Sequence, residues 1–209
     1  MNIDHTAIYA KIRELIGSDR SLGECMAEVV TLCAGVVPHP DWPRLAALEY
    51  DADLASLRSW LAAALEKHSP PFPIHALWFG LSNPSQPELP RGGLRLGFFG
   101  QYDPDDEGLH WIWEGLHHHP AETLASSTSL RSIWQIAYSG KGSLGKDAEW
   151  PLSAAFVALA TCSLLRGPCA PPIPSPEPSI GVAVGFTDGE ILKLGELRDG
   201  EFVVALSAG

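Results

Sequence analysis

The chain has 209 residues, of which 45% are hydrophobic and 19% are charged. This composition suits a soluble globular protein with its own core and excludes a disordered or fibrous chain. Fourteen basic residues stand against 25 acidic ones, which gives a formal net charge of −11. That balance excludes a nucleic-acid binder that relies on lysine and arginine to contact phosphates.

The amino terminus shows neither the basic segment nor the apolar segment of a secretory signal, so we expect a cytoplasmic protein. The longest apolar stretch, Leu152–Leu165, is shorter than the roughly 20 residues that a membrane-spanning helix needs. It predicts a buried helix and no membrane contact. Four cysteines without a C-x-x-C pair predict reduced thiols rather than a disulfide framework.

Helical patterns dominate the first 70 residues. Apolar side chains recur at helical spacing from Asp4 to Ile16. Ser21 and Glu24 form a capping box that predicts the start of a second helix, which ends near Gly35. Asp53 is suited to cap a third helix, which the prolines from Pro70 onward bring to an end. We therefore predict a helical part over residues 1–70.

The pattern changes to that of strands after residue 70. The segment Ile74–Leu81 is short and rich in aliphatic and aromatic residues, and residues 94–99 alternate with period two. A second alternating run, Leu109–Trp113, follows the turn-forming sequence Asp103–Gly108. We expect these two runs to form a hairpin with an acidic tip, with Trp111 and Trp113 on the same face.

Two more helices are predicted at residues 130–137 and 152–165, followed by a proline-rich connection over residues 167–179. Asp188–Gly189 and Asp199–Gly200 then separate three β-prone runs and predict a C-terminal β-meander that extends the sheet. The prediction is a single α+β domain, residues 1–209, with a sheet-containing part at 71–209. Its helices cover one face of a mainly antiparallel sheet.

Two motif matches fit their chemistry only in part. Residues 103–114 resemble the calcium-loop template D-x-D-x-[D/N]-G-x5-E, but Glu107 replaces the third Asp or Asn and the flanks look like strands rather than helices. Residues 140–146 fit G-x-x-x-x-G-K, but Asp147 stands where a phosphate-binding loop needs Ser or Thr. We expect an acidic hairpin tip and an interhelical loop instead, and we assign no cofactor.

A histidine-rich segment leaves an enzymatic alternative open. His117, His118 and His119 follow His110 and Glu114, and imidazoles are common ligands of transition metals. In a strand, His117 and His119 would share one face and His118 would lie on the other. The alternative is a metal-dependent or small-molecule-binding enzyme that uses the acidic and histidine cluster at residues 103–119. We nevertheless assign no catalytic residue and no metal ligand.

The acidic tip and its aromatic neighbours favour a protein-binding role. Tryptophan contributes strongly to protein interfaces, and clustered carboxylates steer the approach of a basic partner. The leading prediction is a non-enzymatic module that binds a basic protein. Its expected contact residues are those of the tip and the following aromatic run: Asp103, Asp105, Asp106, Glu107, Trp111 and Trp113.

Two short segments resemble a known group of proteins. Val182–Glu190, with Leu194–Gly195 beyond it, and Leu77–Leu81 are similar to segments of uncharacterised bacterial proteins. Some of those small acidic cytoplasmic proteins resemble immunity proteins, which neutralise toxins. The resemblance implies an interaction role and carries over no functional residue.

Overall fold

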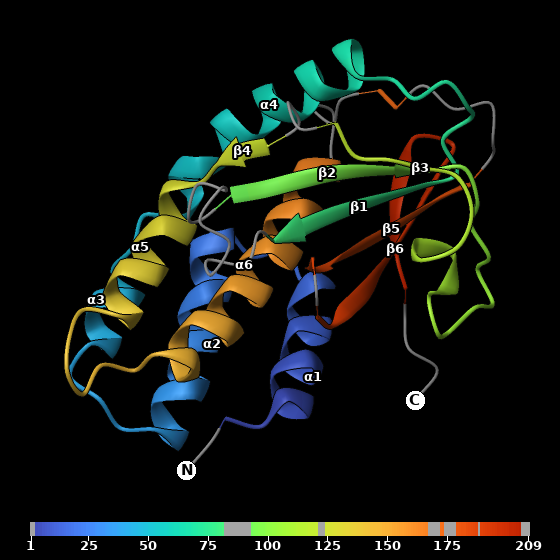
Figure 1. The fold of residues 1–209 in the computed structure, drawn as a ribbon. Coiled ribbons are helices and arrows are strands. Elements are labelled where there is room, and N and C mark those ends of the chain that lie inside the picture. Colours follow the sequence, from blue (N-terminus) through green and yellow to red (C-terminus); the bar gives the residue numbers. More distant parts are fainter. Residues whose placement is uncertain are drawn as a thin grey trace.

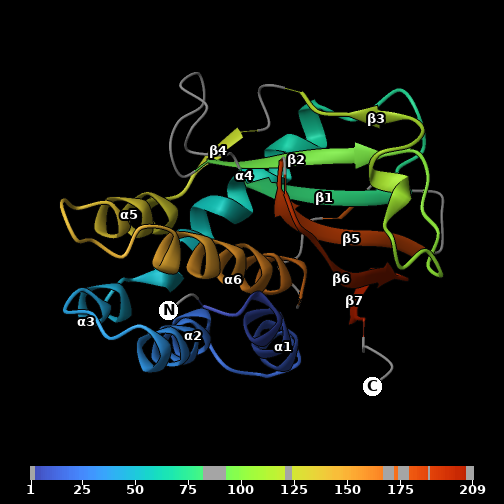
Figure 2. The same ribbon diagram turned by 60° about the horizontal axis from the view of Figure 1, so that its bottom comes forward.

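The computed structural model describes residues 3–81, 93–120, 124–166, 172–173, 179–187 and 189–205. Within these residues the protein has an α+β fold, as predicted. Figures 1 and 2 show most of the helices gathered on one side of a single twisted sheet. The helices are α1 (His5–Ile16), α2 (Leu22–Val36), α3 (Trp42–Ala46), α4 (Asp53–Lys67), α5 (Thr128–Ala137) and α6 (Lys146–Leu165), with 3₁₀ turns η1 (Tyr50–Ala52) and η2 (His110–Ile112).

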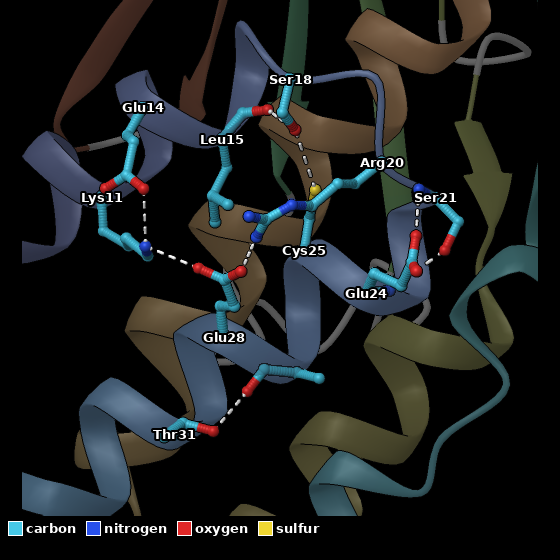
Figure 3. A network of polar contacts seen from close by, with 11 residues as sticks. Lys11, Glu14, Leu15, Ser18, Arg20, Ser21, Glu24, Cys25, Glu28 and Thr31 are labelled. Carbon is cyan, nitrogen blue, oxygen red and sulfur yellow. Dashed lines mark hydrogen bonds and ion pairs between the residues drawn. The ribbon is translucent and has the colours of Figure 1, made fainter.

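The first two helices begin close to their predicted positions, and the capping box predicted for the second is present. The Asp4 side chain accepts a hydrogen bond from the Thr6 amide, and Ser21 and Glu24 form both hydrogen bonds of the capping box. Ion pairs then join the two helices, because Glu28 of α2 contacts Lys11 of α1 at 2.6 Å and also Arg20 in the connecting turn (Figure 3).

The sequence predicted that Asp53 caps its own helix, but the structure shows no such cap. Its carboxylate is buried and accepts hydrogen bonds from the Ser127 hydroxyl at 2.6 Å and the Ser129 amide at 2.8 Å, at the start of α5. Helix α4 instead follows directly from η1, so its first turn continues an existing one. Asp53 thus joins two helices that lie more than 70 residues apart in the chain.

Helix α6 is the central helix of the core. It begins at Lys146, six residues before the predicted start, and contains Pro151 in its interior. It is the one helix of the described residues that is long and apolar enough to cross a membrane, but 83% of its apolar window is buried inside the protein. This burial is typical of the core helix of a soluble protein.

The strands form one sheet with the order β3-β2-β1-β5-β6-β7, and β4 also pairs with β2. Their bounds are β1 (Ala76–Leu81), β2 (Gly93–Phe99), β3 (His117–His118), β4 (Leu124–Ser126), β5 (Ser179–Phe186), β6 (Ile191–Arg198) and β7 (Glu201–Val204). All pairs are antiparallel except β1 with β5. The C-terminal meander therefore extends the sheet as predicted, and it joins through a parallel pair.

The predicted hairpin between residues 94–99 and 109–113 is wrong. Strand β2 pairs with β1, β3 and β4, and residues 109–113 form the η2 turn and its ends. Leu109 has a φ of 53°, which breaks an extended run before it can form. The second predicted Asp-Gly turn is confirmed, since Asp199 and Gly200 have φ values of 52° and 82°.

The sheet separates two apolar clusters. The larger one lies between the helices and one face of the sheet, and it combines residues of the predicted helical and sheet-containing parts. A smaller cluster lies on the other face, around Trp78, Phe99 and Trp111. The three cysteines of the described residues, Cys25, Cys33 and Cys162, are buried and free. Most of the predicted connection 167–179, together with Asp188, lies outside the described residues.

Candidate functional site

The face of the sheet away from the helices carries the segment between β2 and β3, which we call the crossing loop (residues 100–116). Beneath and beside the loop, aromatic rings lie against glycines of the strands. The ring of Trp78 lies over Gly80, and the ring of Tyr102 lies over Gly181, so a Cβ atom at either glycine would collide with the ring. These glycines allow the rings to approach the backbone closely.

Apolar side chains fix the middle of the crossing loop to the sheet. Leu109, Trp111 and Ile112 are buried there. Trp111 meets the rings of Phe99 and Tyr102 edge to face, with centroids 5.5 Å apart in both pairs. The sequence predicted Trp111 as a contact residue for a partner. That prediction is wrong, because Trp111 anchors the loop to the protein's own sheet.

A polar clamp fixes the start of the loop. The Tyr102 hydroxyl donates a 2.7 Å hydrogen bond to Glu196 of β6, which also accepts hydrogen bonds from Ser179 and Arg198, both at 2.8 Å. Burial alone would raise the pKa of Glu196, but these three donors outweigh it and hold the pKa below its usual range. Burial and the neighbouring carboxylate raise the pKa of Tyr102. The clamp therefore holds an ionised carboxylate against a neutral phenol.

Lys193 of β6 adds a second contact to the same part of the loop. Its ammonium group donates a 2.7 Å hydrogen bond to the carbonyl of Pro104 and lies 5.1 Å from the centroid of the Tyr102 ring. Lys193 of the sheet thus stabilises the start of the loop by a hydrogen bond and a cation–π contact.

Asp106 differs from the other acidic residues of the loop. Its carboxylate accepts hydrogen bonds from the amides of Gly108 and His110 and lies 2.8 Å from the His110 ring nitrogen. Desolvation alone would raise the pKa of Asp106, but these hydrogen bonds and the charge of His110 together outweigh it and lower the pKa, and the same contact raises the pKa of His110. Asp106 was predicted to contact a partner, but its carboxylate is occupied by hydrogen bonds from within the loop, at and before the start of η2.

Three predicted residues, Asp103, Asp105 and Glu107, are exposed, and Glu114 joins them. Trp113 is 60% exposed and Leu116 is 61% exposed, so each presents a large apolar side chain to solvent. Trp111 and Trp113 were predicted on one face of a strand, but the η2 turn directs one inward and the other outward. Asp105, Glu107 and Glu114 form no ion pair within the described part of the chain.

The groups of the enzymatic alternative do not converge in the part of the chain that the structure describes. No cluster of three or more His, Cys, Asp or Glu side chains there could hold a metal ion. His110 turns to Asp106, and His118 stacks on Phe98 with ring centroids 6.1 Å apart. His117 and His119 lie side by side on the other face, with centroids 5.3 Å apart.

The two motif matches lie in unsuitable surroundings. The segment that resembles a calcium loop lies between strands β2 and β3 and contains the η2 turn, and the Asp103 carboxylate accepts a hydrogen bond from the Asp105 amide. The glycine-rich segment at residues 140–146 connects two helices, α5 and α6, whereas a phosphate-binding loop follows a strand. Both segments therefore act as connections in this fold.

A second polar group lies on the helical side of the sheet. Glu190 accepts a 2.8 Å hydrogen bond from the Tyr9 hydroxyl and lies 3.3 Å from a ring nitrogen of His5, whose ring stacks on Trp150. Beside it is a small hollow of about 10 Å³ with mainly apolar walls. This volume holds about one water molecule and is far below the roughly 300–1,000 Å³ of most small-molecule sites. We interpret the group as the attachment of α1 to the end of β5 and β6.

Sequence reasoning missed the residues that hold the crossing loop. Tyr102 and Glu196 are 94 positions apart, and Lys193 contacts Pro104 across 89 positions. No local pattern signals such pairs, because only the strand order brings β6 close to the start of the loop. Leu116 was missed for a related reason, since an isolated leucine gives no sign of its exposure.

We compared the chain with protein-family models, curated proteins and solved structures. No family model, curated protein or solved structure matches the chain.

Proposed function

We propose that the chain is a protein-binding module that recognises a basic protein through its crossing loop. The observation that carries the proposal is the pair Trp113 and Leu116, which are 60% and 61% exposed on a clamped loop that also exposes four carboxylates. Large apolar side chains with a charged rim are a common arrangement at protein interfaces.

The clamped loop supports the proposal energetically. Binding costs less when the contact segment is already ordered, because fewer side chains and backbone torsions must be fixed. Trp111 and the Tyr102–Glu196 hydrogen bond supply that order at two points of the loop. Trp113 and Leu116 then provide the buried centre of the interface, and the carboxylates attract lysine and arginine side chains of the partner.

The setting of the proposal is the bacterial cytoplasm. Three buried, free cysteines suit a reducing compartment. The resemblance of two short segments to bacterial immunity-type proteins implies the specific form of the proposal, in which the basic partner is a toxin. This form rests on the general proposal, and both use the same surface.

The test compares capture of basic proteins by matched variants. The loop variant carries Asp105→Asn, Glu107→Gln and Glu114→Gln, which changes the net charge from −11 to −8. The control carries Asp19→Asn, Glu49→Gln and Glu66→Gln, three exposed carboxylates of the helical part with the same change of charge. A third variant replaces Trp113 and Leu116 with alanine. Each is immobilised, exposed to bacterial extract and washed at increasing salt concentration.

We expect the loop variant and the Trp113/Leu116 variant to lose a basic protein that the wild type and the control retain, with weaker retention at higher salt. Equal loss in the loop variant and the control would show that net charge alone acts. Retention by all the variants, or no captured basic protein, would contradict the proposal.

A further inference from the structure

The histidine run at the end of the crossing loop is divided between the two faces of the sheet. In β3, His117 pairs with Phe99 and His118 pairs with Phe98 of β2. Phe98 belongs to the core on the helical side, and Phe99 belongs to the cluster on the other face. His119 continues the alternation and lies against Gly97, close to Phe99. His117 and His119 thus share the face that carries the crossing loop.

The spacing of these two rings matches that of two imidazoles on one metal ion. A zinc–nitrogen bond of about 2.0–2.1 Å places the ion about 3.2 Å from a ring centroid, so two ligands at a tetrahedral angle have centroids about 5.2 Å apart. The centroids of His117 and His119 are 5.3 Å apart, with ring planes at 39°. The separation of the two rings is therefore compatible with their binding one ion.

The surroundings of each ring leave its Nε2 atom for such an ion. Nδ1 of His117 lies 3.3 Å from the carbonyl oxygen of Gly115, a contact in which Nδ1 carries the proton. Nδ1 of His119 faces Gly97 and is buried without a hydrogen-bond partner within the described residues. The lone pair of Nε2 is therefore the donor that His117 offers, and Nε2 is also the nitrogen that His119 has available, because its Nδ1 is buried.

We propose that His117 and His119 form a two-histidine chelate for a borderline divalent transition metal such as Zn²⁺, Ni²⁺ or Cu²⁺, with water completing the coordination. Imidazole suits these ions, whereas Ca²⁺ and Mg²⁺ require oxygen ligands. This site is independent of the proposed partner surface, which uses Trp113, Leu116 and the carboxylates.

The site is weak and exchangeable, for three reasons. It has two protein ligands, since no group of three potential ligands occurs within the described residues. Binding at Nε2 of His119 leaves a proton on its buried Nδ1, a donor without an acceptor, which lowers the affinity about tenfold to a hundredfold. The cation of Arg95 also acts on His119 and opposes a second positive charge.

His118 serves as a matched control, because it lies between the two proposed ligands in sequence but faces the other side of the sheet. Tag-free protein is titrated with NiCl₂ and with ZnCl₂, followed by calorimetry and by the NMR signals of the histidine rings. We expect one equivalent of metal to bind the wild type and His118→Gln equally. The affinity of His117→Gln and of His119→Gln should be at least about tenfold lower, because each loses half of the chelate.

The NMR signals provide a readout that does not depend on stability. Paramagnetic Ni²⁺ should broaden the ring signals of His117 and His119 before those of His110 and His118. His117 is exposed, so His117→Gln keeps the fold even where His119→Gln disturbs the packing over Gly97. Binding that survives His117→Gln, equal loss in His118→Gln, or no binding at millimolar metal would overturn the proposal.

Discussion

On the helical side of the sheet, strands β1, β2 and β5 present large apolar residues that interlock with α6 and its neighbours. On the other side, several equivalent positions are glycines, and the space above them is filled by rings and by a single loop. Several buried polar atoms on this second side have no partner within the described residues, among them Nε1 of Trp78, Nε1 of Trp111 and Nδ1 of His119. We therefore expect the first face to contribute more to the free energy of folding, whereas the loop on the second face exposes Trp113 and Leu116.

The largest effect should come from removing a core side chain of the helical side. Phe156 of α6 is fully buried and packs near Tyr50, so Phe156→Ala should lower the free energy of unfolding by about 3–5 kcal/mol. Trp113→Ala removes a larger ring from the other side, but the ring is mostly exposed, so the change should stay within about 0.5 kcal/mol. Urea denaturation measures both values. Similar losses in the two variants would contradict the contrast between the faces.

A smaller effect should follow from filling the space under a ring. In Gly181→Ala the new Cβ atom would overlap the ring of Tyr102, which cannot move away easily because Glu196 holds its hydroxyl. We expect a loss of about 1–3 kcal/mol from overpacking.

Gly35→Ala is the matched control for this substitution. Gly35 lies in α2 with no atom within 4 Å of the new Cβ, so alanine should stabilise the helix by up to about 1 kcal/mol. Thermal denaturation of the two variants should therefore shift in opposite directions. A stabilised Gly181→Ala variant would show that the ring does not need the glycine.

A comparison of the sequence predictions with the structure separates local features, which were predicted, from tertiary contacts, which were not. The capping box at Ser21, the alternation in β2 and the Asp199–Gly200 turn act over a few residues, and each was predicted correctly. Asp53 and Trp111 were misassigned because their partners are set by tertiary structure. The hydrogen bonds of Asp53 reach the start of α5, and Trp111 packs under a loop whose course depends on the strand order.

The residues of the candidate surface also fall into those that the sequence could predict and those that it could not. Exposure of Asp103, Asp105 and Glu107 was predictable, because a polar turn segment favours solvent whichever strands it connects. The inward turn of Asp106 was not, since it depends on the 3₁₀ turn that places the amide and ring of His110 next to it.

The Tyr102–Glu196 clamp should respond to pH in one direction. The pKa of Glu196 is lowered in the folded protein, so its ionised form stabilises the fold above its ordinary pKa of about 4.3. That contribution is lost as the pH falls through the lower, folded value. Glu196→Gln should cost about 1 kcal/mol at neutral pH and should increase hydrogen exchange in residues 100–116.

Hydrogen exchange of the wild type should show the same loosening at a pH below about 4, and Glu196→Gln should lack this pH dependence. Arg198→Gln removes one donor and keeps the Tyr102 bond, so it serves as the milder control. Unchanged exchange in the crossing loop of Glu196→Gln would show that Trp111 alone holds the loop.

The smallest effect concerns the pair formed by the half-buried Asp106 and the exposed His110. The pKa of His110 is raised, chiefly by its hydrogen bond to Asp106, so the protonated ring favours the folded loop fully below its ordinary pKa of about 6.5. This contribution is lost as the pH rises through the higher, folded value. NMR titration should give His110 a pKa above that of a free histidine, and Asp106→Asn should return it toward the ordinary value.

Because both side chains reach solvent, added salt should weaken their charge interaction and reduce the shift of the His110 pKa. If His110 titrates identically in wild type and Asp106→Asn, the carboxylate does not face the ring in solution, and Asp106 is then exposed to a partner like the other acidic residues of the loop.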